Sequence, residues 1–436
     1  MAIDERWLIY LVPLAIVVAV HLLLRRKSER KSLALLSEAR ASGLDEPTSL
    51  HPHINPLLCI GCGACVKACP EGDVLGLIRG KAQLVAPSEC IGHGACRAAC
   101  PVGAIALVFG TERRGVELPH VGPDFQTNVP GLYIAGELGG MGLIRNAIEQ
   151  GHQAMTQIAG RRKQHKRDKL QDADVVIVGA GPAGISASLA AKVSGLRAVT
   201  LEQEELGGTV SHYPRGKLVM TAPAVLPGYG KMKFREVGKE ALLEFWKGVI
   251  ARARLQIDYG ERVEALGRDE QGFTVSTGRR TLRAPAVLLA IGRRGTPRRL
   301  GAPGEELSKV VYRLIDPRQY AGRAVLVVGG GDSALEAAAT LAEETDARVT
   351  LAYRGNGFAR AKSKNRARVA AAHAAGRLDI RMETEVRRIE PDIVEIEQAG
   401  QFVRLSNNAV IVCAGGILPT DFLRAAGVEI EVRHGR

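Results

Sequence analysis

Seven of the eight cysteines lie in two short runs, residues 59–70 and 90–101. The first run has the spacing C-x2-C-x2-C-x3-C-P, and the second repeats it except that His93 stands at the second cysteine position. Closely spaced thiolates of this kind hold iron–sulfur cubes, which carry single electrons, so two runs predict two clusters close together. The candidate metal ligands are Cys59, Cys62, Cys65, Cys69, Cys90, His93, Cys96 and Cys100.

Other uses of the cysteines fit this spacing less well. Disulfide pairing does not explain the x2-x2-x3-Pro pattern, and zinc sites tend to use C-x2-C pairs that lie far apart in the chain. The glycines between the cysteines also let backbone amides approach the sulfurs, which is one way in which a protein sets a cluster's potential.

The two runs resemble those of bacterial two-cluster ferredoxins. The resemblance implies a small α+β domain with two 4Fe-4S clusters, in which three thiolates of one run grip one cube and the fourth ligates the other. It assigns cluster one to Cys59, Cys62, Cys65 and Cys100, and cluster two to Cys90, Cys96 and Cys69 with one corner left over.

That corner falls on His93. A neutral imidazole can bind iron, and replacing a thiolate by imidazole removes negative charge and raises the reduction potential. We favour ligation by His93. The alternative is a three-iron cluster that lacks this corner, with a solvated histidine beside it.

Composition narrows the class of protein. The chain has 436 residues and 46% hydrophobic content, enough for two or three cores. Its 4% aromatic content argues against a platform that stacks on single-stranded nucleic acid. The net charge of +13 is concentrated in two runs and favours an anionic membrane surface over nucleic acid. Thiolate-held clusters need a reducing compartment, so we expect the bulk of the chain in the cytoplasm.

The segment from Trp7 to Leu24 is almost entirely apolar, and at about 1.5 Å per residue it just spans a bilayer core. Basic residues at 25–31 follow it, which predicts a single-pass inner-membrane anchor with the amino terminus outside. A cleavable signal peptide would instead need positive charge before the apolar stretch. His21 would reach headgroups, and residues 31–41 would form a juxtamembrane helix lying on lipid.

Two glycine-rich loops each follow a buried apolar strand and begin a helix. In the first, Gly179 permits a tight turn, Gly181 lets the backbone approach a pyrophosphate, and Gly184 packs helix on strand. Glu202 ends the next strand at the distance of a ribose. The second loop spans residues 329–334. The sequence therefore predicts an α/β protein with two Rossmann-like dinucleotide-binding domains.

Three further segments, residues 122–157, 207–209 and 286–292, resemble thioredoxin-reductase-like flavoproteins. In that family Glu137 would meet the ribityl chain or pyrophosphate of FAD, and the helix after it would direct its amino-terminal dipole at the flavin ring. The resemblance assigns FAD to Gly136, Glu137, Ala147, Gly179, Gly181, Pro182, Ala183, Gly184, Glu202, Gly208, Thr209, Ala290 and Gly292.

The family places its nicotinamide cofactor at the second loop, which assigns it to Gly329, Gly331, Asp332, Ser333 and Ala334. The strand that follows ends at Tyr353 and Arg354 with no acidic residue to accept a ribose 2′-hydroxyl. Arg354 and Arg360, with Lys362 and Lys364, would instead bind a 2′-phosphate. We therefore expect NADPH in preference to NADH.

The order of these segments is unusual. In the family, the segment matched by residues 122–157 ends the chain, whereas here it precedes the first glycine loop. Residues 416–436 resemble the segment that returns to the flavin domain, and the chain stops there. We interpret the flavoprotein as circularly permuted, which is tolerable when domain ends lie close together. Alternatively, the displaced segment completes the flavin site of a neighbouring subunit.

We expect eight regions in chain order. They are an anchor at 1–24, a basic juxtamembrane segment at 25–50, a ferredoxin domain at 51–110, the permuted flavin segment at 111–160, a basic linker at 161–171, an FAD domain at 172–300, an NAD(P)H domain at 301–415 and a return segment at 416–436.

The NAD(P)H domain has no C-x-x-C pair, since Cys413 stands alone inside a Val-Ile-Val strand, where we expect an inert core thiol. The chain therefore resembles the dithiol-less groups, ferredoxin–NADP reductase and bacillithiol-disulfide reductase. Residues 212–217, including His212, Tyr213 and Lys217, would either touch flavin or substrate or simply pack as a loop.

Three hypotheses remain open. The first is an NAD(P)H:ferredoxin-type oxidoreductase that links NADPH, FAD and two clusters to an unidentified acceptor, because flavin exchanges hydride on one side and single electrons on the other. The second is a flavin-dependent reductase of a small disulfide or unsaturated substrate, fed by the clusters. The third is an electron-transfer subunit of a larger membrane complex. We expect a homodimer with an unidentified redox partner, protein or quinone, and no nucleic acid.

Overall fold

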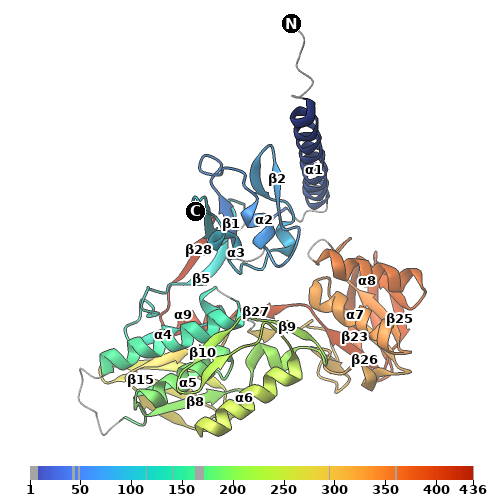
Figure 1. The fold of residues 1–436 in the computed structure, drawn as a ribbon. Helices are drawn as coiled ribbons and strands as arrows, with labels where there is room; N and C mark the ends of the chain where they lie inside the picture. The colour runs from blue at the N-terminus through green and yellow to red at the C-terminus, as the bar shows by residue number, and fades with distance from the viewer. Residues whose placement is uncertain are drawn as a thin grey trace. The chain divides into compact units, whose positions relative to one another are not determined.

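The computed structural model describes residues 8–41, 45–47, 50–113, 115–140, 142–162, 171–293, 295–358 and 361–435 (Figure 1). Most of the basic linker and Arg360 lie outside these residues. The chain forms two compact units. The smaller comprises Met1–Val116 with Arg433–Arg436, and the larger comprises Glu117–Val432.

The smaller unit contains a duplicated pattern of strands and short helices. β1 (His51–Ile54) pairs antiparallel with β4 (Ile105–Val108), and β2 (Leu75–Ile78) pairs antiparallel with β3 (Lys81–Leu84). Each cysteine run contains one short helix, α2 (Ala64–Ala68) in the first and α3 (Ala95–Ala98) in the second. Cys59, Cys65 and Cys96 are buried in the core together with apolar residues of these strands.

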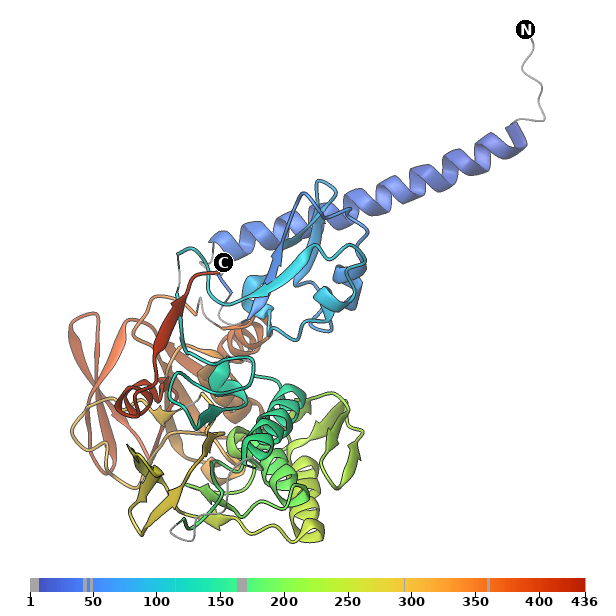
Figure 2. The same ribbon diagram turned by 90° about the vertical axis from the view of Figure 1, so that its left-hand side faces the viewer.

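The smaller unit begins with α1 (Leu8–Ala41), a single helix whose amino-terminal half extends beyond the rest of the unit (Figure 2). Within the described ranges, no helix combines the length and apolar character needed to cross a membrane. The expected anchor, orientation and membrane localisation are therefore wrong. Trp7, at the start of the expected span, lies outside the described residues.

The basic half of α1 contacts protein where we expected lipid. Ser32 and Ala39 are buried and lie on one face of the helix, two turns apart. Gly76 of β2 leaves room for Ser32, because a Cβ on Gly76 would lie 2.3 Å from the Ser32 hydroxyl oxygen. Lys31 Nζ lies 2.5 Å from an Asp73 carboxylate oxygen, although both side chains are mostly exposed and such a pair stabilises little. Apolar residues between Tyr10 and Leu24 remain exposed.

The first half of the larger unit is built on a five-stranded sheet in the order β13-β8-β7-β17-β6. Its central strands read Val-Val-Ile-Val and Val-Leu-Leu, as expected for a parallel sheet that is covered on both faces. The strands are β6 (Leu132–Ile134), β7 (Val175–Val178), β8 (Ala198–Glu202), β13 (Asp258–Tyr259) and β17 (Val287–Leu289), and the helices are α4 (Ile144–Arg162), α5 (Pro182–Val193) and α6 (Lys239–Ala253).

Small antiparallel elements surround this sheet. They are β9 (Leu218–Met220) with β12 (Glu236–Gly238), β10 (Ala224–Leu226) with β11 (Gly230–Met232), and the meander β14 (Val263–Asp269), β15 (Gly272–Thr277) and β16 (Thr281–Ala284).

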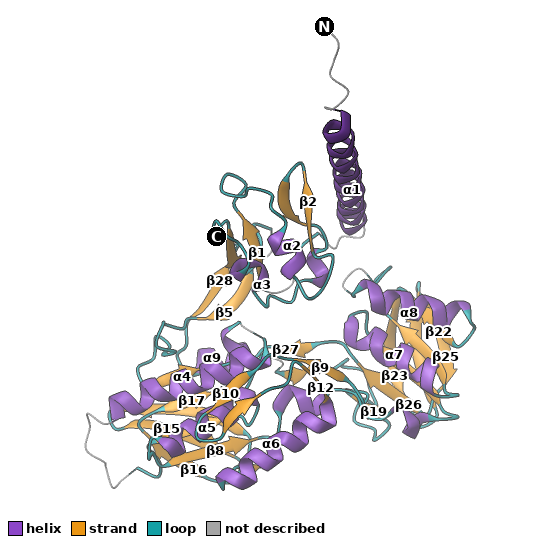
Figure 3. Cartoon of the chain, viewed as in Figure 1, coloured by secondary structure: helices purple, strands orange, loops and turns teal. Residues whose placement is uncertain are grey.

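The second half repeats the pattern, with a sheet in the order β19-β26-β20-β21-β22 and the helices α7 and α8 packed beside it (Figure 3). Its elements are β19 (Val310–Val311), β20 (Ala324–Val328), α7 (Asp332–Glu344), β21 (Arg348–Ala352), α8 (Ser363–Ala374), β22 (Leu378–Arg381), β23 (Thr384–Ile389), β24 (Ile393–Gln398), β25 (Gln401–Ser406) and β26 (Ala409–Val412). A short pair, β18 (Thr296–Pro297) and β27 (Gly416–Ile417), connects the two halves.

The segment before the first glycine loop belongs to the first sheet. β6 is its edge strand and runs parallel to β17. α4 lies against α5 so closely that a Cβ on Gly151 would come within 2.1 Å of the Ala183 carbonyl oxygen. Asp174, buried at the start of β7, links the end of α4 to the first sheet. Burial opposes its ionisation, but hydrogen bonds from the Arg197 backbone and the Arg162 guanidinium lower its pKa.

The end of the chain lies beside the start of this segment. After α9 (Thr420–Ala425), β28 (Ile430–Arg433) pairs with β5 (Val116–Pro119). Asn128 donates to the Gly427 carbonyl at 2.8 Å and accepts from the Glu429 amide at 2.9 Å. The return segment and the displaced segment are therefore neighbours in space, although about 300 residues separate them in the chain.

Candidate active site and cluster ligands

A cleft of about 2360 Å³ lies in the larger unit and is lined by both glycine loops. The carboxyl ends of β7 and β17 open onto it in the first half, as do those of β20 and β26 in the second. This is the edge of a parallel sheet at which dinucleotides bind.

The first glycine loop has the shape that the sequence predicts. Gly179 has φ +108°, a conformation that side chains disfavour. A Cβ on Gly184 would lie 1.8 Å from the Gly179 carbonyl oxygen, so this glycine serves helix–strand packing. A Cβ on Gly181 would meet no protein atom closer than 3.9 Å. The space beside Gly181 is therefore open to a ligand, as a pyrophosphate requires.

Glu202 ends β8 with its carboxylate buried at the cleft wall. It accepts hydrogen bonds from the Ala180 amide at 2.7 Å and the Glu204 amide at 3.0 Å. These bonds fix the carboxylate beside the glycine turn, where it can accept from ribose hydroxyls.

The displaced segment supplies another wall of the same cleft. Gly136, Glu137 and Ala147 line it, and the Gly136 amide donates to Gln150 at 2.8 Å. Arg293 lies close enough to Glu137 to interact with it. Burial lowers the pKa of Arg293, and the carboxylates of Glu137 and Glu117 oppose that effect.

All but one of the predicted FAD residues line the cleft, the exception being Gly184 with its packing role. The residues that line it are Gly136, Glu137, Ala147, Gly179, Gly181, Pro182, Ala183, Glu202, Gly208, Thr209, Ala290 and Gly292. They fit the phosphate, ribose and ribityl parts of FAD.

The second loop also opens onto the cleft. Gly331 has no protein atom within 4 Å of a Cβ position, and Ser333 is exposed at the start of α7. Ala334 is fully buried and does not line the cleft. Asp332 accepts from the Lys362 amide and from Asn365, both at 2.8 Å, so it holds the loop after β21 in place.

Of the predicted 2′-phosphate ligands, the structure places Arg354 at the cleft, exposed at the end of β21. Lys362 and Lys364 do not line it, and Arg360 lies outside the described residues. The cleft is also lined by several arginines that were not predicted from the sequence to lie there. They are Arg262, Arg293, Arg298, Arg299, Arg313 and Arg387.

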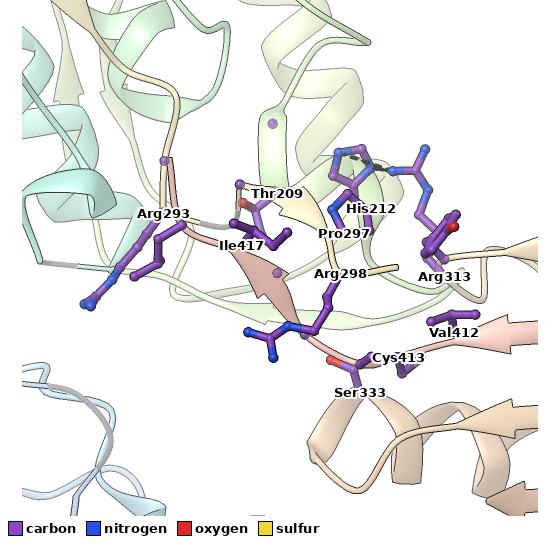
Figure 4. Close-up of a pocket in the computed structure, with 18 of the residues that line it drawn as sticks. Thr209, His212, Arg293, Pro297, Arg298, Arg313, Ser333, Val412, Cys413 and Ile417 are labelled. Carbon is purple, nitrogen blue, oxygen red and sulfur yellow. Dashed lines mark hydrogen bonds between the residues drawn. The ribbon is translucent and has the colours of Figure 1, made fainter. Parts of the chain in front are cut away.

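Arg298 is one of these arginines, and it is drawn near Ser333 of the second loop (Figure 4). Its backbone amide donates to the Gly415 carbonyl at 2.9 Å, and its side chain is drawn on the side of Ser333 and Cys413 (Figure 4). Cys413 follows β26 and is half-buried at the cleft wall. The sequence-based placement of this thiol inside the core strand is therefore wrong.

Residues 212–217 tie the two halves of the larger unit together. Lys217 Nζ lies 2.7 Å from both carboxylate oxygens of Glu336 on α7. His212 contacts Arg313 and lies 3.1 Å from Glu204 (Figure 4). His212, Tyr213 and Lys217 do line the cleft, and Lys217 is held by an ion pair across it.

In the smaller unit, a small cavity is lined by Cys59, Cys62, Cys65 and Cys100, the four residues that the ferredoxin resemblance assigns to cluster one. The Ala82 amide donates to Cys59 Sγ at 3.4 Å and the Ala104 amide to Cys100 Sγ at 3.3 Å. Hydrogen bonds from backbone amides to sulfur stabilise the thiolates that bind a cluster.

Three more thiols of the two cysteine runs lie near one another. Cys69, Cys90 and Cys96 are close enough to influence one another's ionisation, and burial raises the pKa of the Cys90 thiol to about 11. Among the described residues, no three His, Cys, Asp or Glu side chains are placed to hold a single metal ion. A cubane presents a separate iron to each thiolate, and the four cysteines that line the cavity, Cys59, Cys62, Cys65 and Cys100, fit that demand for one 4Fe-4S cluster.

Comparison with known families agrees with this geometry. Residues 176–435 match the pyridine nucleotide-disulphide oxidoreductase family, and residues 51–101 match the 4Fe-4S dicluster domain. The chain belongs to the pyridine nucleotide-disulphide oxidoreductases. This family member is an FAD-dependent oxidoreductase that uses NADP(H) and carries a 4Fe-4S ferredoxin domain.

Individual relatives cover the larger unit. A ferredoxin–NADP reductase from Thermus thermophilus is 33% identical over 59% of this chain and 77% of its own length. Bacilliredoxin reductase Bdr from Bacillus subtilis is 26% identical over 60% of this chain and 82% of its own. The solved bacillithiol disulfide reductase Bdr from Staphylococcus aureus aligns with a TM-score of 0.52 and 22% identity, over 60% of this chain and 82% of that one, which shows a shared fold.

Proposed function

We propose that this enzyme passes electrons between NADPH and iron–sulfur clusters by way of FAD, and exchanges them with a one-electron partner that is still to be identified. The observation that carries the proposal is the joint lining of one cleft by both glycine loops, in a chain that also holds a cluster-binding unit. A bound flavin supplies the conversion between two-electron hydride transfer and single-electron steps.

The chain's own residues bind and orient the cofactors. Glu202 accepts from ribose, and the amides around Gly181 and Gly331 approach the pyrophosphates. The Lys217–Glu336 ion pair holds α7, and with it the second loop, toward the flavin half of the cleft. No protein base is assigned, since hydride transfer between two bound cofactors requires none.

Arg354 would give the second loop its preference for NADPH. Replacing Arg354 with leucine should raise KM for NADPH by about 10- to 100-fold and leave KM for NADH nearly unchanged, because a charged contact to the 2′-phosphate is worth about 1.5–3 kcal/mol. Steady-state kinetics with both cofactors would measure this. Arg348→Leu is the matched control, because Arg348 is exposed at the other end of β21. Equal losses for NADPH and NADH would refute the assignment.

The order of segments is proposed to be a circular permutation of the usual flavoprotein. The contacts of Asn128 with residues 427–429 and the pairing of β5 with β28 support it. They bring the return segment next to the displaced segment, and these two segments are consecutive in the usual chain order. In this structure the displaced segment packs within its own chain.

A flavin-dependent disulfide reductase is the second candidate, favoured by the resemblance to Bdr. Anaerobic turnover of purified protein separates the two candidates. NADPH oxidation driven by a one-electron acceptor such as ferricyanide, and more strongly by a ferredoxin, supports our proposal. Oxidation that depends on a low-molecular-weight disulfide supports the second. Failure with every acceptor until cell membranes or extract are added would indicate a subunit of a larger complex.

A further inference from the structure

We infer that His93 is the fourth protein ligand of the second cluster, bound through Nε2, and that this makes the second cluster the more oxidising of the two. The inference rests on the 4Fe-4S domain and is independent of the direction of electron flow in the proposed function. It concerns the one position at which the second cysteine run departs from the first.

The backbone places His93 where the first run has Cys62. Gly63 has φ 74° and ψ 5°, and Gly94 has φ 78° and ψ 4°. Both glycines begin a short helix. A Cβ on either would touch a leucine methyl group, that of Leu77 at 3.4 Å or Leu107 at 3.1 Å. The two runs are therefore near copies of each other in three dimensions as well as in spacing.

This equivalence matters because the Cys62 position is a ligand position. Cys62 lines the cavity that it shares with Cys59, Cys65 and Cys100. Because the two runs share this backbone geometry, we expect the residue between Gly92 and Gly94 to face the second group of thiols, Cys69, Cys90 and Cys96. A side chain at this position needs only a lone pair to complete the fourth corner.

The imidazole has an atom ready for that role. His93 Nε2 is buried and has no hydrogen-bond partner among the described residues. Leaving such an atom unsatisfied costs about 1–3 kcal/mol, and an iron ion would remove that cost. Nδ1 accepts from the Ala95 amide at a long 3.4 Å. Iron binding at Nε2 would place the ring proton on Nδ1 and end this weak contact.

The ligand exchange has an electrical consequence. An imidazole is neutral whereas a thiolate carries a negative charge, so a cluster with three thiolates and one imidazole is less negative by one unit. Such exchange raises the reduction potential, as the His-ligated iron of Rieske centres illustrates. Added electrons would therefore settle on the second cluster before the first.

Glu71 is the competing ligand at this corner. Its carboxylate is close enough to influence the ionisation of both His93 and Cys90. An oxygen ligand from Glu71 would leave His93 as a bystander. This alternative is separable from the inference because iron-bound nitrogen and oxygen give different magnetic signatures.

The test uses anaerobically purified full-length protein labelled with ¹⁵N-histidine. We expect about eight irons per chain, four in each cluster, and a strong ¹⁵N hyperfine coupling in pulsed EPR of the reduced protein. In His93→Cys, the irons should be retained, the coupling should vanish and the midpoint potential of the second cluster should fall. In Glu71→Gln, all three properties should match the unaltered protein.

Three results would overturn the inference. They are a content of about seven irons with a three-iron signal in the unaltered protein, a ¹⁵N coupling that survives in His93→Cys, and an unchanged midpoint potential in that variant. Absence of the ¹⁵N coupling from the unaltered protein, together with an iron content that falls in Glu71→Gln, would likewise assign the corner to the carboxylate. Cysteine is the ordinary ligand at this position, so His93→Cys is expected to fold and assemble its clusters.

Discussion

A chain that begins at residue 171 should accumulate without bound flavin, whereas a relinked chain should regain it. The shortened chain lacks β6 and α4, which supply Gly136, Glu137 and Ala147 to the cleft. Their removal would also expose one edge of β17 and the buried face of α5 on which Gly151 rests. We expect complete loss of the yellow flavin spectrum and a large fall in soluble yield.

The relinked chain restores the missing parts in the usual order. It joins residue 433 to residue 116 through a short glycine-containing turn, so that β28 and β5 become a hairpin, and it ends at residue 162. Hydrogen bonds from His120 to Glu429 and from Gly435 to Phe109 show that the two segments run in opposite directions, as a hairpin needs. Stoichiometric FAD in the relinked chain is the expected result. Full FAD occupancy in the shortened chain would contradict the role assigned to the displaced segment.

Gly181→Ala should lower FAD affinity by about 10- to 100-fold with little change in the stability of the flavin-free protein. Its Cβ would meet no protein atom within 3.9 Å, so the methyl group obstructs only the ligand, at a cost of roughly 1.4–3 kcal/mol. Flavin titration and thermal unfolding of the flavin-free protein would measure both quantities.

Gly184→Ala is the matched control, three residues along the same loop. Its Cβ would lie 1.8 Å from the Gly179 carbonyl oxygen, so this variant should lose about 1–3 kcal/mol or more of unfolding free energy even without flavin. Equal effects of the two substitutions on the flavin-free protein would show that the open space beside Gly181 is not a ligand site.

The sequence predicted much of the chemistry because local constraints determine it. The resemblance to two-cluster ferredoxins assigns Cys59, Cys62, Cys65 and Cys100 to one cluster, and these four residues line one cavity in the structure. The glycine loops could also be predicted from the sequence, because the close approach of Gly184 to Gly179 admits only glycine at position 184. The similarity of residues 122–157 to a flavin-contacting segment likewise predicted that β6 and α4 belong to the flavin domain.

The features that sequence reasoning missed depend on tertiary contacts. Apolar length and flanking charge suggested a membrane span, but in the structure the basic half of α1 packs on β2 through Ser32. Asp332, which was assigned to a cofactor, lines the cleft, but its hydrogen bonds from Lys362 and Asn365 had no signal in the sequence. Cleft arginines such as Arg262 and Arg387 have no distinguishing local sequence pattern in a chain with 59 basic residues.

An anaerobic NADPH titration of the purified protein, followed by flavin absorbance and low-temperature EPR together, tests the central claim most directly. We predict that the flavin bleaches and that cluster signals appear in proportion to the NADPH added, with the second cluster reduced first. Two results together would contradict electron transfer between the flavin and the clusters. In the titration, the flavin would bleach while the clusters stay oxidised in excess NADPH. In a second experiment without NADPH, chemically reduced clusters would fail to reduce the flavin.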